Sequence, residues 1–257
     1  MGTASATLYC RSSESMPEIP SNSIQLVLTS PPYFPVDAEP FLYGGNRTGM
    51  TAGEAFERIS SFAGTTLQAN LKECARVLAP GGHLVLQTRD VRIGSCLVPV
   101  EPLHRSFAEA CGLELVCRHF WRSASEKGSR LGIRDALARK YGPLPINPEV
   151  FLVFVKPGAE PRLGEPESED LELLSADFMR TQAGTLPARH RFQSPLKVVR
   201  AFIRTYTREG DTVLDPFAGG GSVAHEAVQL GRNAVLWEID PQSVSLIKQN
   251  VEVKEAK

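Results

Sequence analysis

Residues 211–222 read Asp-Thr-Val-Leu-Asp-Pro-Phe-Ala-Gly-Gly-Gly-Ser, and this stretch decides the fold that we expect. An apolar run enters a glycine-rich turn, and residues 223–230 then read as a helix. The glycines let the backbone come close to a ligand at the amino terminus of that helix. A second apolar run, 234–237, ends at Glu238, near the place where nucleotide folds hold a carboxylate for ribose hydroxyls. The order strand, glycines, helix, strand, acid predicts a doubly wound α/β sheet with a cofactor site.

A second stretch ends in the tetrapeptide Ser30-Pro31-Pro32-Tyr33, after an apolar run over 24–28 that reads as a buried parallel strand. The prolines stop that strand because neither can donate to a ladder. In open α/β sheets, ligands bind beyond the carboxyl ends of the strands. The Ser30 hydroxyl and the Pro31 carbonyl can accept the hydrogens of an amino group on a flat ring, and Tyr33 can stack on that ring. A plain proline-rich turn is the alternative, and the tetrapeptide alone does not exclude it.

Together the two stretches resemble the amino-methyltransferases of DNA. Thr29-Ser30-Pro31-Pro32-Tyr33 is similar to the catalytic motif of that family, and residues 215–222 are similar to its S-adenosylmethionine motif. The catalytic motif comes first and the cofactor motif last, as in the permuted β group. The resemblance covers nearly the whole chain. It implies one methyltransferase domain over 1–257, built on a Rossmann-like sheet that is mostly parallel, has an antiparallel strand and carries its motifs in circularly permuted order.

The resemblance implies S-adenosylmethionine as cofactor and assigns residues to it. In related enzymes the loop after the first strand carries an acid near the adenine; here it reads Cys10-Arg11-Ser12-Ser13, so Ser12 or a backbone amide takes that place. The approach to a helix near Pro195 matches the segment that packs on the methionine end. The expected cofactor-binding residues are Asp215, Pro216, Phe217, Gly219, Gly221, Ser222, Glu238, Ser12, Phe192 and Ser194.

Composition narrows the class of protein. The 257 residues are 42% hydrophobic, enough for a packed core, and the net charge is −1, so any DNA contact must rest on local charge. The five cysteines form no C-x-x-C pair, which argues against a disulfide framework or a zinc site, and we expect no metal. We see neither a signal peptide nor an apolar run that approaches a membrane span. We therefore expect a cytoplasmic protein.

Charge changes sign along the second half of the chain. Residues 118–140 hold seven basic and two acidic residues, and we expect an insertion at about 122–148 to contact DNA phosphates, with a solvated loop as the alternative. Residues 157–180 hold seven acidic and two basic residues, so about 157–188 reads as an exposed acidic linker. Residues 34–50 read as a long loop, either a binding loop or a flexible connection. The expected DNA-binding residues are Arg122, Lys127, Arg130, Arg134, Arg139 and Lys140.

Periodicity and helix signals predict the other elements. A helix over 52–78 presents Leu67, Leu71 and Cys74 on one face and stops at a Pro-Gly-Gly turn. Asp240 reads as the cap of a C-terminal helix. The remaining predicted elements are strands over 6–9, 83–87, 113–121 and 150–155, and helices over 100–111, after Pro195 and over 241–251.

The expected reaction moves a methyl group from S-adenosylmethionine to the exocyclic amino group of a base flipped out of double-stranded DNA. Ser30 ahead of Pro-Pro-Tyr resembles the cytosine-N4 members, with adenine N6 as the alternative target. An RNA base methyltransferase and a DNA-binding module without catalysis are the rival functions. A cognate restriction endonuclease is a candidate partner, no membrane is expected, and the chain is expected to be a monomer or a homodimer.

Overall fold

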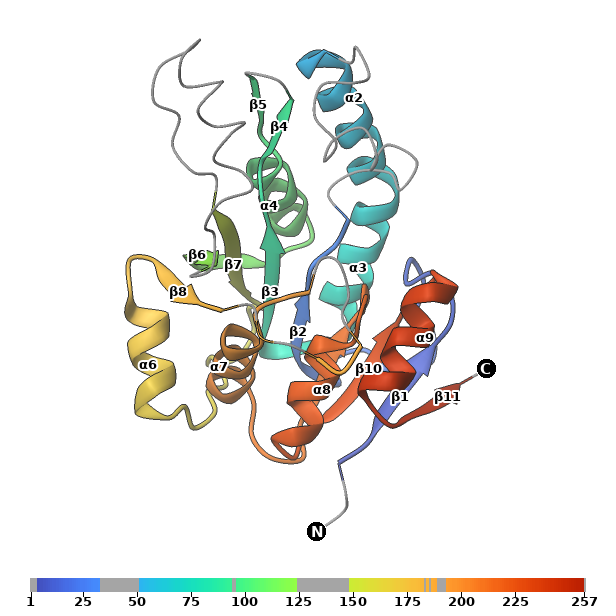
Figure 1. Cartoon of the computed structure of the whole chain (residues 1–257), viewed down its shortest axis with the longest axis vertical. Helices are drawn as coiled ribbons and strands as arrows, with labels where there is room; N and C mark the ends of the chain where they lie inside the picture. Colours follow the sequence, from blue (N-terminus) through green and yellow to red (C-terminus); the bar gives the residue numbers. More distant parts are fainter. Residues whose placement is uncertain are drawn as a thin grey trace.

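The sheet of this protein has nine strands among the residues that the structure describes. The structure is a computed structural model, and it describes residues 4–32, 51–93, 96–123, 148–182, 184, 186–188 and 193–256. The strands are β1 (Ala6–Tyr9), β2 (Ile24–Thr29), β3 (Leu78–Thr88), β6 (Glu114–Ser123), β7 (Glu149–Val155), β8 (Met179–Thr181), β9 (Thr212–Asp215), β10 (Asn233–Trp237) and β11 (Val253–Ala256). They lie in the order β11-β1-β10-β9-β2-β3-β7-β6-β8 (Figure 1).

Most neighbouring strands run parallel, and β7 is antiparallel to both β3 and β6. The chain runs outward in both directions from the β9–β2 pair, first into β3 and later into β10. This arrangement confirms the predicted doubly wound, mostly parallel sheet with an antiparallel strand. It also places the turning point of the sheet between the strands of the two motifs.

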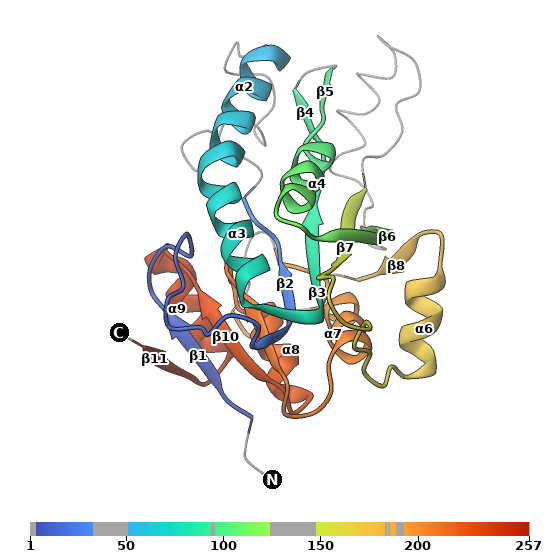
Figure 2. The same ribbon diagram turned by 180° about the vertical axis from the view of Figure 1, so that it is seen from behind.

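Helices cover both faces of the sheet. The helical elements are α2 (Ala52–Phe62), the π-helical turn η2 (Ala63–Leu67), α3 (Gln68–Val77), α4 (Glu101–Ala110), α6 (Ser168–Ser175), α7 (Leu196–Tyr206), α8 (Ser222–Gln229) and α9 (Pro241–Asn250). Helices α7, α8 and α9 lie in front of the sheet in Figure 1, and α3 and α4 lie in front of it in Figure 2. Each face therefore has its own apolar core.

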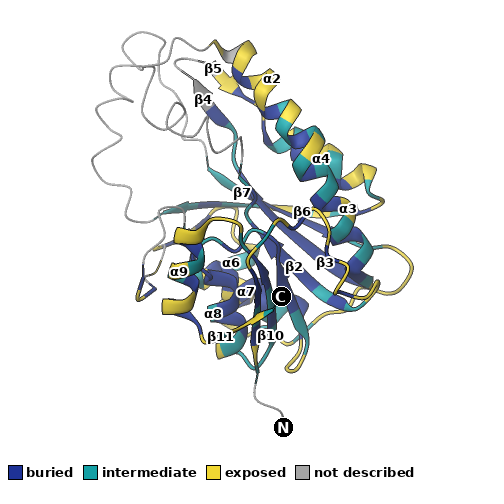
Figure 3. Ribbon diagram, turned by 90° about the vertical axis from the view of Figure 1, so that its right-hand side faces the viewer, coloured by how far each residue is buried: buried dark blue, intermediate teal, exposed yellow. Residues whose placement is uncertain are grey.

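The sequence explains why these helices pack as they do. On α7, Val198, Val199, Phe202 and Ile203 recur at helical spacing and are buried in the first core. On the other face, Leu71 of α3 belongs to a second core with the alternate residues of β2 and β3. Figure 3 shows the strands largely buried and the outer faces of the helices exposed.

The acidic segment differs from the expected exposed linker. It contains α6, which packs on α7, and β8, which adds to the sheet edge beside β6. Several of its acids pair with α7: Arg204 contacts Glu167 at 2.8 Å and Asp170 at 3.3 Å. Met179 lies in the first core, and Leu173 and Leu174 are partly buried against it, which favours an ordered segment although most of its acids stay exposed.

Three further features were not expected from the sequence. Strand β11 extends the sheet beside β1, a hairpin of β4 (Val91–Ile93) and β5 (Cys96–Val98) follows β3, and a π-helical turn interrupts the long helix.

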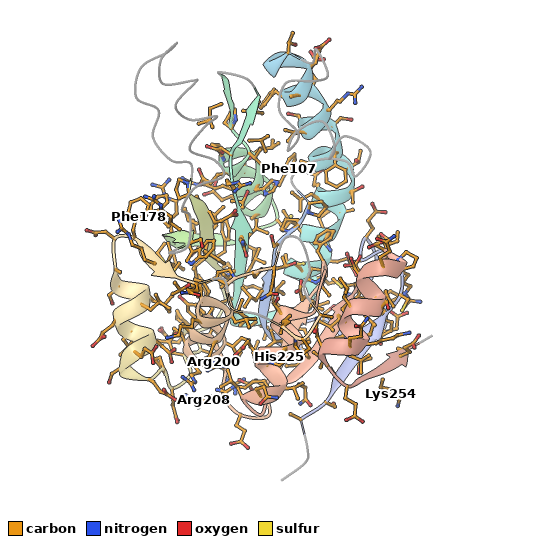
Figure 4. The ribbon with its side chains drawn as sticks, in the orientation of Figure 1. Phe107, Phe178, Arg200, Arg208, His225 and Lys254 are labelled. Carbon is orange, nitrogen blue, oxygen red and sulfur yellow. The ribbon has the colours of Figure 1, made fainter. Side chains whose placement is uncertain are left out.

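Helices α7 and α8 are joined by an ion pair in which Arg200, labelled in Figure 4, donates to Glu226 at 2.7 Å. No helix among the described residues is long and apolar enough to cross a membrane.

Candidate active site

The two motifs meet at the carboxyl edge of the sheet. Strands β2 and β9 are parallel neighbours, with Leu26 opposite Val213 and Val27 opposite Leu214. Both strands therefore end at the same edge, and Ser30 and Asp215 follow from adjacent strand ends. Ser30 is half-buried and Pro31 is buried, so the turn after β2 is held against the protein. The sheet brings together motifs that stand far apart in the chain, as the fold prediction required.

A buried hydrogen bond joins the two motifs directly. The Thr29 hydroxyl donates to Oδ1 of Asp215 at 2.7 Å, and each residue is only 3% exposed. The backbone N–H of Phe217 donates to the same oxygen at 3.1 Å. The sequence predicted Asp215 as a site residue but not Thr29. The position of Thr29 directly before the tetrapeptide was the signal that could have identified it.

The environment of Asp215 makes its carboxyl harder to ionise than an ordinary aspartate. Burial raises the pKa of this carboxyl to about 7; the two hydrogen bonds oppose that rise and the charge of Glu238 adds to it. Among the described residues, no Lys or Arg forms an ion pair with it. A buried carboxylate without a cation is costly. The site is therefore suited to a cofactor that carries positive charge.

The glycine-rich loop after β9 has the backbone that its sequence predicts. Gly219 and Gly221 have φ values of 53° and 81°, which side-chain-bearing residues rarely adopt. A Cβ on Gly221 would also meet Ile247 of α9 at 3.4 Å. Asn250 holds the loop by donating to the carbonyl of Gly220 at 2.8 Å. The loop thus presents bare backbone at the start of α8, where a ligand can approach closely.

Glu238 lies immediately after β10 and is held by the backbone around it. Its Oε2 accepts from Gly219 N–H at 2.7 Å, and its Oε1 accepts from the N–H groups of Ile239 and Asp240 at 2.9 Å each. Burial raises the pKa of Glu238, and these amide bonds act against the rise. The carboxylate is fixed beside the glycine loop, where it can accept hydrogen bonds from ribose hydroxyls. Asp240 caps α9 by accepting from Ser243 N–H at 2.9 Å, as predicted.

In the loop after β1, the serine that bonds to the cofactor motif is Ser13, the neighbour of the expected Ser12. Ser12 is exposed and accepts from Glu14 N–H at 3.3 Å. Its neighbour Ser13 is buried and donates to the carbonyl of Pro216 at 2.8 Å, while Asn70 donates to the Ser13 hydroxyl at 2.9 Å. Asn70 is a polar residue on the otherwise apolar face of α3, which was the signal for a structural role. Ser13 and Asn70 hold this loop against the cofactor motif.

Ser194 lies near the carboxyl end of β3. Its hydroxyl donates to Oε1 of Gln87 at 2.8 Å, and Gln87 is 7% exposed. Sequence reasoning did not name Gln87, because a single glutamine at the end of an apolar strand carries no motif.

Several expected site residues lie outside the described residues. These are Tyr33, Phe192, Lys127, Arg130, Arg134, Arg139 and Lys140, together with the loop over 34–50. Arg122 is described; it belongs to β6 and is partly buried. No cluster of three or more His, Cys, Asp or Glu suited to a metal ion occurs within the described ranges.

Comparison with known proteins identifies the family. The profile of the N6/N4 methyltransferases, described as DNA methylase, matches residues 24–249. The type II methyltransferase M.MjaI of Methanocaldococcus jannaschii is 27% identical over 274 residues, which cover 93% of this chain and 89% of that protein. M.MthZI of Methanothermobacter thermautotrophicus is also 27% identical, over 95% of this chain and 76% of its own.

Solved structures share the fold. PvuII DNA methyltransferase, which is cytosine-N4-specific, aligns with a TM-score of 0.74 at 18% identity, over 96% of this chain and 86% of its own. A DNA modification methylase from Thermus thermophilus, complexed with S-adenosyl-L-methionine, aligns with a TM-score of 0.69 at 21% identity, over 98% of this chain and 100% of its own. The predicted family and the predicted cofactor are thus confirmed. The chain belongs to the N6/N4 DNA methylase family, whose members transfer a methyl group from S-adenosylmethionine to an amino group of DNA.

Proposed function

We propose that this protein methylates the exocyclic N4 of cytosine within a short DNA sequence, with adenine N6 as the alternative target. The observation that carries the proposal is the β2–β9 register, which brings the Ser-Pro-Pro turn and the cofactor loop to one edge of the sheet. The buried bond from Thr29 to Asp215 supports it, because it holds the two motifs at a defined spacing. Ser30 favours cytosine over adenine, because a serine ahead of Pro-Pro-Tyr resembles the motif of the cytosine-N4 members.

The proposed chemistry needs orientation and hydrogen-bond acceptors. S-adenosylmethionine would supply a methyl group on a sulfonium, whose sulfur leaves as a neutral thioether while the amino nitrogen bonds the methyl and releases one proton. The amino nitrogen of the base is the weak partner, because its lone pair is drawn into the ring. Hydrogen bonds from the amino group to the Ser30 hydroxyl and the Pro31 carbonyl favour a pyramidal nitrogen whose lone pair is directed at the methyl group. Tyr33 supplies the face on which the flipped base stacks.

The cofactor is proposed to lie along the loop from Asp215 to Ser222. Asp215 faces it with a carboxyl that gains by pairing with a cation, Gly219 and Gly221 allow close approach, and Glu238 accepts from the ribose. Pro216 and Phe217 continue the same surface. Ser12, Phe192 and Ser194 stay expectations from the resemblance.

DNA binding is proposed for the basic insertion at about 122–148. The flipped base must leave the duplex, at a cost of a few kcal/mol that phosphate contacts and stacking help to offset. A restriction endonuclease is proposed as a partner, because two relatives at 27% identity are named type II methyltransferases. The protein is proposed to act as a monomer or a homodimer.

Product analysis tests the proposed function. Unmethylated DNA is incubated with the purified protein and labelled S-adenosylmethionine, then digested to nucleosides and separated by mass spectrometry. N4-methylcytosine is the expected product, and it should be absent with the Ser30→Ala variant at short times. N6-methyladenine alone would transfer the assignment to adenine. Methylated RNA without methylated DNA, or cofactor binding without any product, would overturn the proposal.

A further inference from the structure

Gln87 stands beside the proposed acceptor of the target amino group. In the parallel pair of β2 and β3, Leu28 lies opposite Val85 and Thr29 lies opposite Leu86. Continuing this register places Ser30 beside Gln87. Leu28 and Val85 both belong to the core beneath α7, and side chains two residues on point to the same face of a sheet. The register therefore directs Ser30 and Gln87 to one face, at the edge where the two motifs meet.

Ser194 fixes the orientation of the Gln87 amide. Its hydroxyl donates to Oε1 of Gln87 at 2.8 Å, so the carbonyl end of the amide is already engaged. Within the described part of the chain, no hydrogen bond from the Gln87 amide nitrogen is found. Gln87 is only 7% exposed, yet its amide nitrogen is not among the fully buried polar atoms that lack a partner, so this donor keeps an opening to the site. A ligand that offers an acceptor next to Ser30 would satisfy that donor.

The proposed substrate offers this pattern of donors and acceptors. Cytosine carries a ring acceptor, N3, next to its amino group, and adenine carries N1 next to its own. We infer that the Gln87 amide donates to the ring nitrogen adjacent to the target amino group, and that Ser194 holds the amide in that orientation. Gln87 thereby recognises the acceptor that cytosine and adenine present beside the amino group. This inference rests on the proposed function and adds a base-binding residue to it.

A double-mutant cycle between the protein and the base tests the contact. Once product analysis has identified the target, duplexes are made in which the target base has a C–H in place of the ring nitrogen, 3-deazacytosine or 1-deazaadenine. Wild-type single-turnover methylation should slow tenfold or more on the analogue. The Gln87→Met variant, which keeps the volume of the side chain, should be slowed to a similar degree on the normal base. It should lose little more on the analogue, because the same contact is already missing. The cycle also cancels the altered reactivity of the analogue's amino group.

Two more variants separate a base contact from a structural role. Gln87→Glu places an acceptor against the ring nitrogen, so its rate should recover as pH falls and the carboxyl gains a proton to donate. Ser194→Ala frees the amide, and it should weaken discrimination between the base and its analogue without abolishing turnover. Gln25→Ala is the matched control: Gln25 lies at the opposite end of β2, where its amide contacts Ser23 and Thr212, and its variant should keep the full response to the analogue.

Calorimetry with S-adenosylmethionine completes the test. Cofactor affinity should be unchanged in Gln87→Met. Loss of cofactor affinity with a full response to the analogue would assign Gln87 to the cofactor and overturn the inference. The inference would also be overturned if the analogue slowed Gln87→Met by the same factor as it slows the wild type. If the wild-type protein yields no methylated base, the proposed function itself fails. That outcome differs from an active protein whose methylation rate does not depend on Gln87, which would overturn only this inference.

Discussion

Replacing Asp215 with Asn should stabilise the free protein at alkaline pH while weakening cofactor binding. The pKa of Asp215 is about 7 in the folded protein against 3.8 without the fold. The folded state therefore binds an extra proton between these values, so stability falls as pH rises from about 4 to about 7 and changes little above. With about 1.4 kcal/mol for each pKa unit, the ionised side chain destabilises the folded state by about 4 kcal/mol at pH 8, and by about 2 kcal/mol at pH 5.5.

The Asn variant removes this titration but keeps the local geometry. Its carbonyl oxygen can still accept from Thr29 and from the N–H of Phe217. Urea denaturation of both proteins at pH 5.5 and pH 8 gives their free energies of unfolding. The difference between variant and wild type should move in favour of the variant by about 2 kcal/mol over this pH range. A difference that does not change with pH would refute the assignment of a buried, uncompensated carboxyl at this position.

The same substitution should weaken cofactor binding although it stabilises the fold. The amide of the Asp215→Asn variant carries no charge to pair with a cationic cofactor, so affinity for S-adenosylmethionine at pH 8 should fall tenfold or more by calorimetry. The wild-type affinity should itself fall as pH drops below about 7, because the cofactor then competes with a proton. Wild-type affinity in the variant would remove Asp215 from the cofactor site. A more stable but inactive variant would be an example of the trade-off between stability and activity at functional sites.

Three other outcomes follow from the site and its surroundings. Gly219→Val should abolish S-adenosylmethionine binding in calorimetry, because φ is 53° there and valine is strained at that value; unchanged affinity would remove the loop from the cofactor site. Replacing Arg130, Arg134 and Arg139 with Ala should weaken DNA binding and flatten its salt dependence with cofactor affinity unchanged, whereas an unaltered salt slope would place the DNA surface elsewhere. Ser30→Ala should slow single-turnover methylation by about one to two decades, since a buried amino hydrogen loses its partner, while a full rate would make the turn merely structural.

The local parts of this protein could be predicted from its sequence. The glycine loop needs backbone angles that glycine adopts freely, and the structure shows positive φ at Gly219 and Gly221. The prolines at 31 and 32 had to end β2, and Asp240 had to cap the helix that follows it. Each of these features depends on neighbours within a few residues, so the residue types alone determine it. The order of the two motifs also determined the permuted, doubly wound arrangement.

The tertiary structure alone decided which distant residues meet. The Thr29–Asp215 bond joins positions 186 apart, and the Gln87–Ser194 bond joins positions 107 apart. Strand pairing and register set these contacts, and neither is visible in local periodicity. The acidic segment shows the same limit: its charges predicted an exposed linker, and most of its residues are exposed, yet it forms α6 and β8 and places Met179 in the first core. Burial depends on what a segment packs against, which only the folded chain provides.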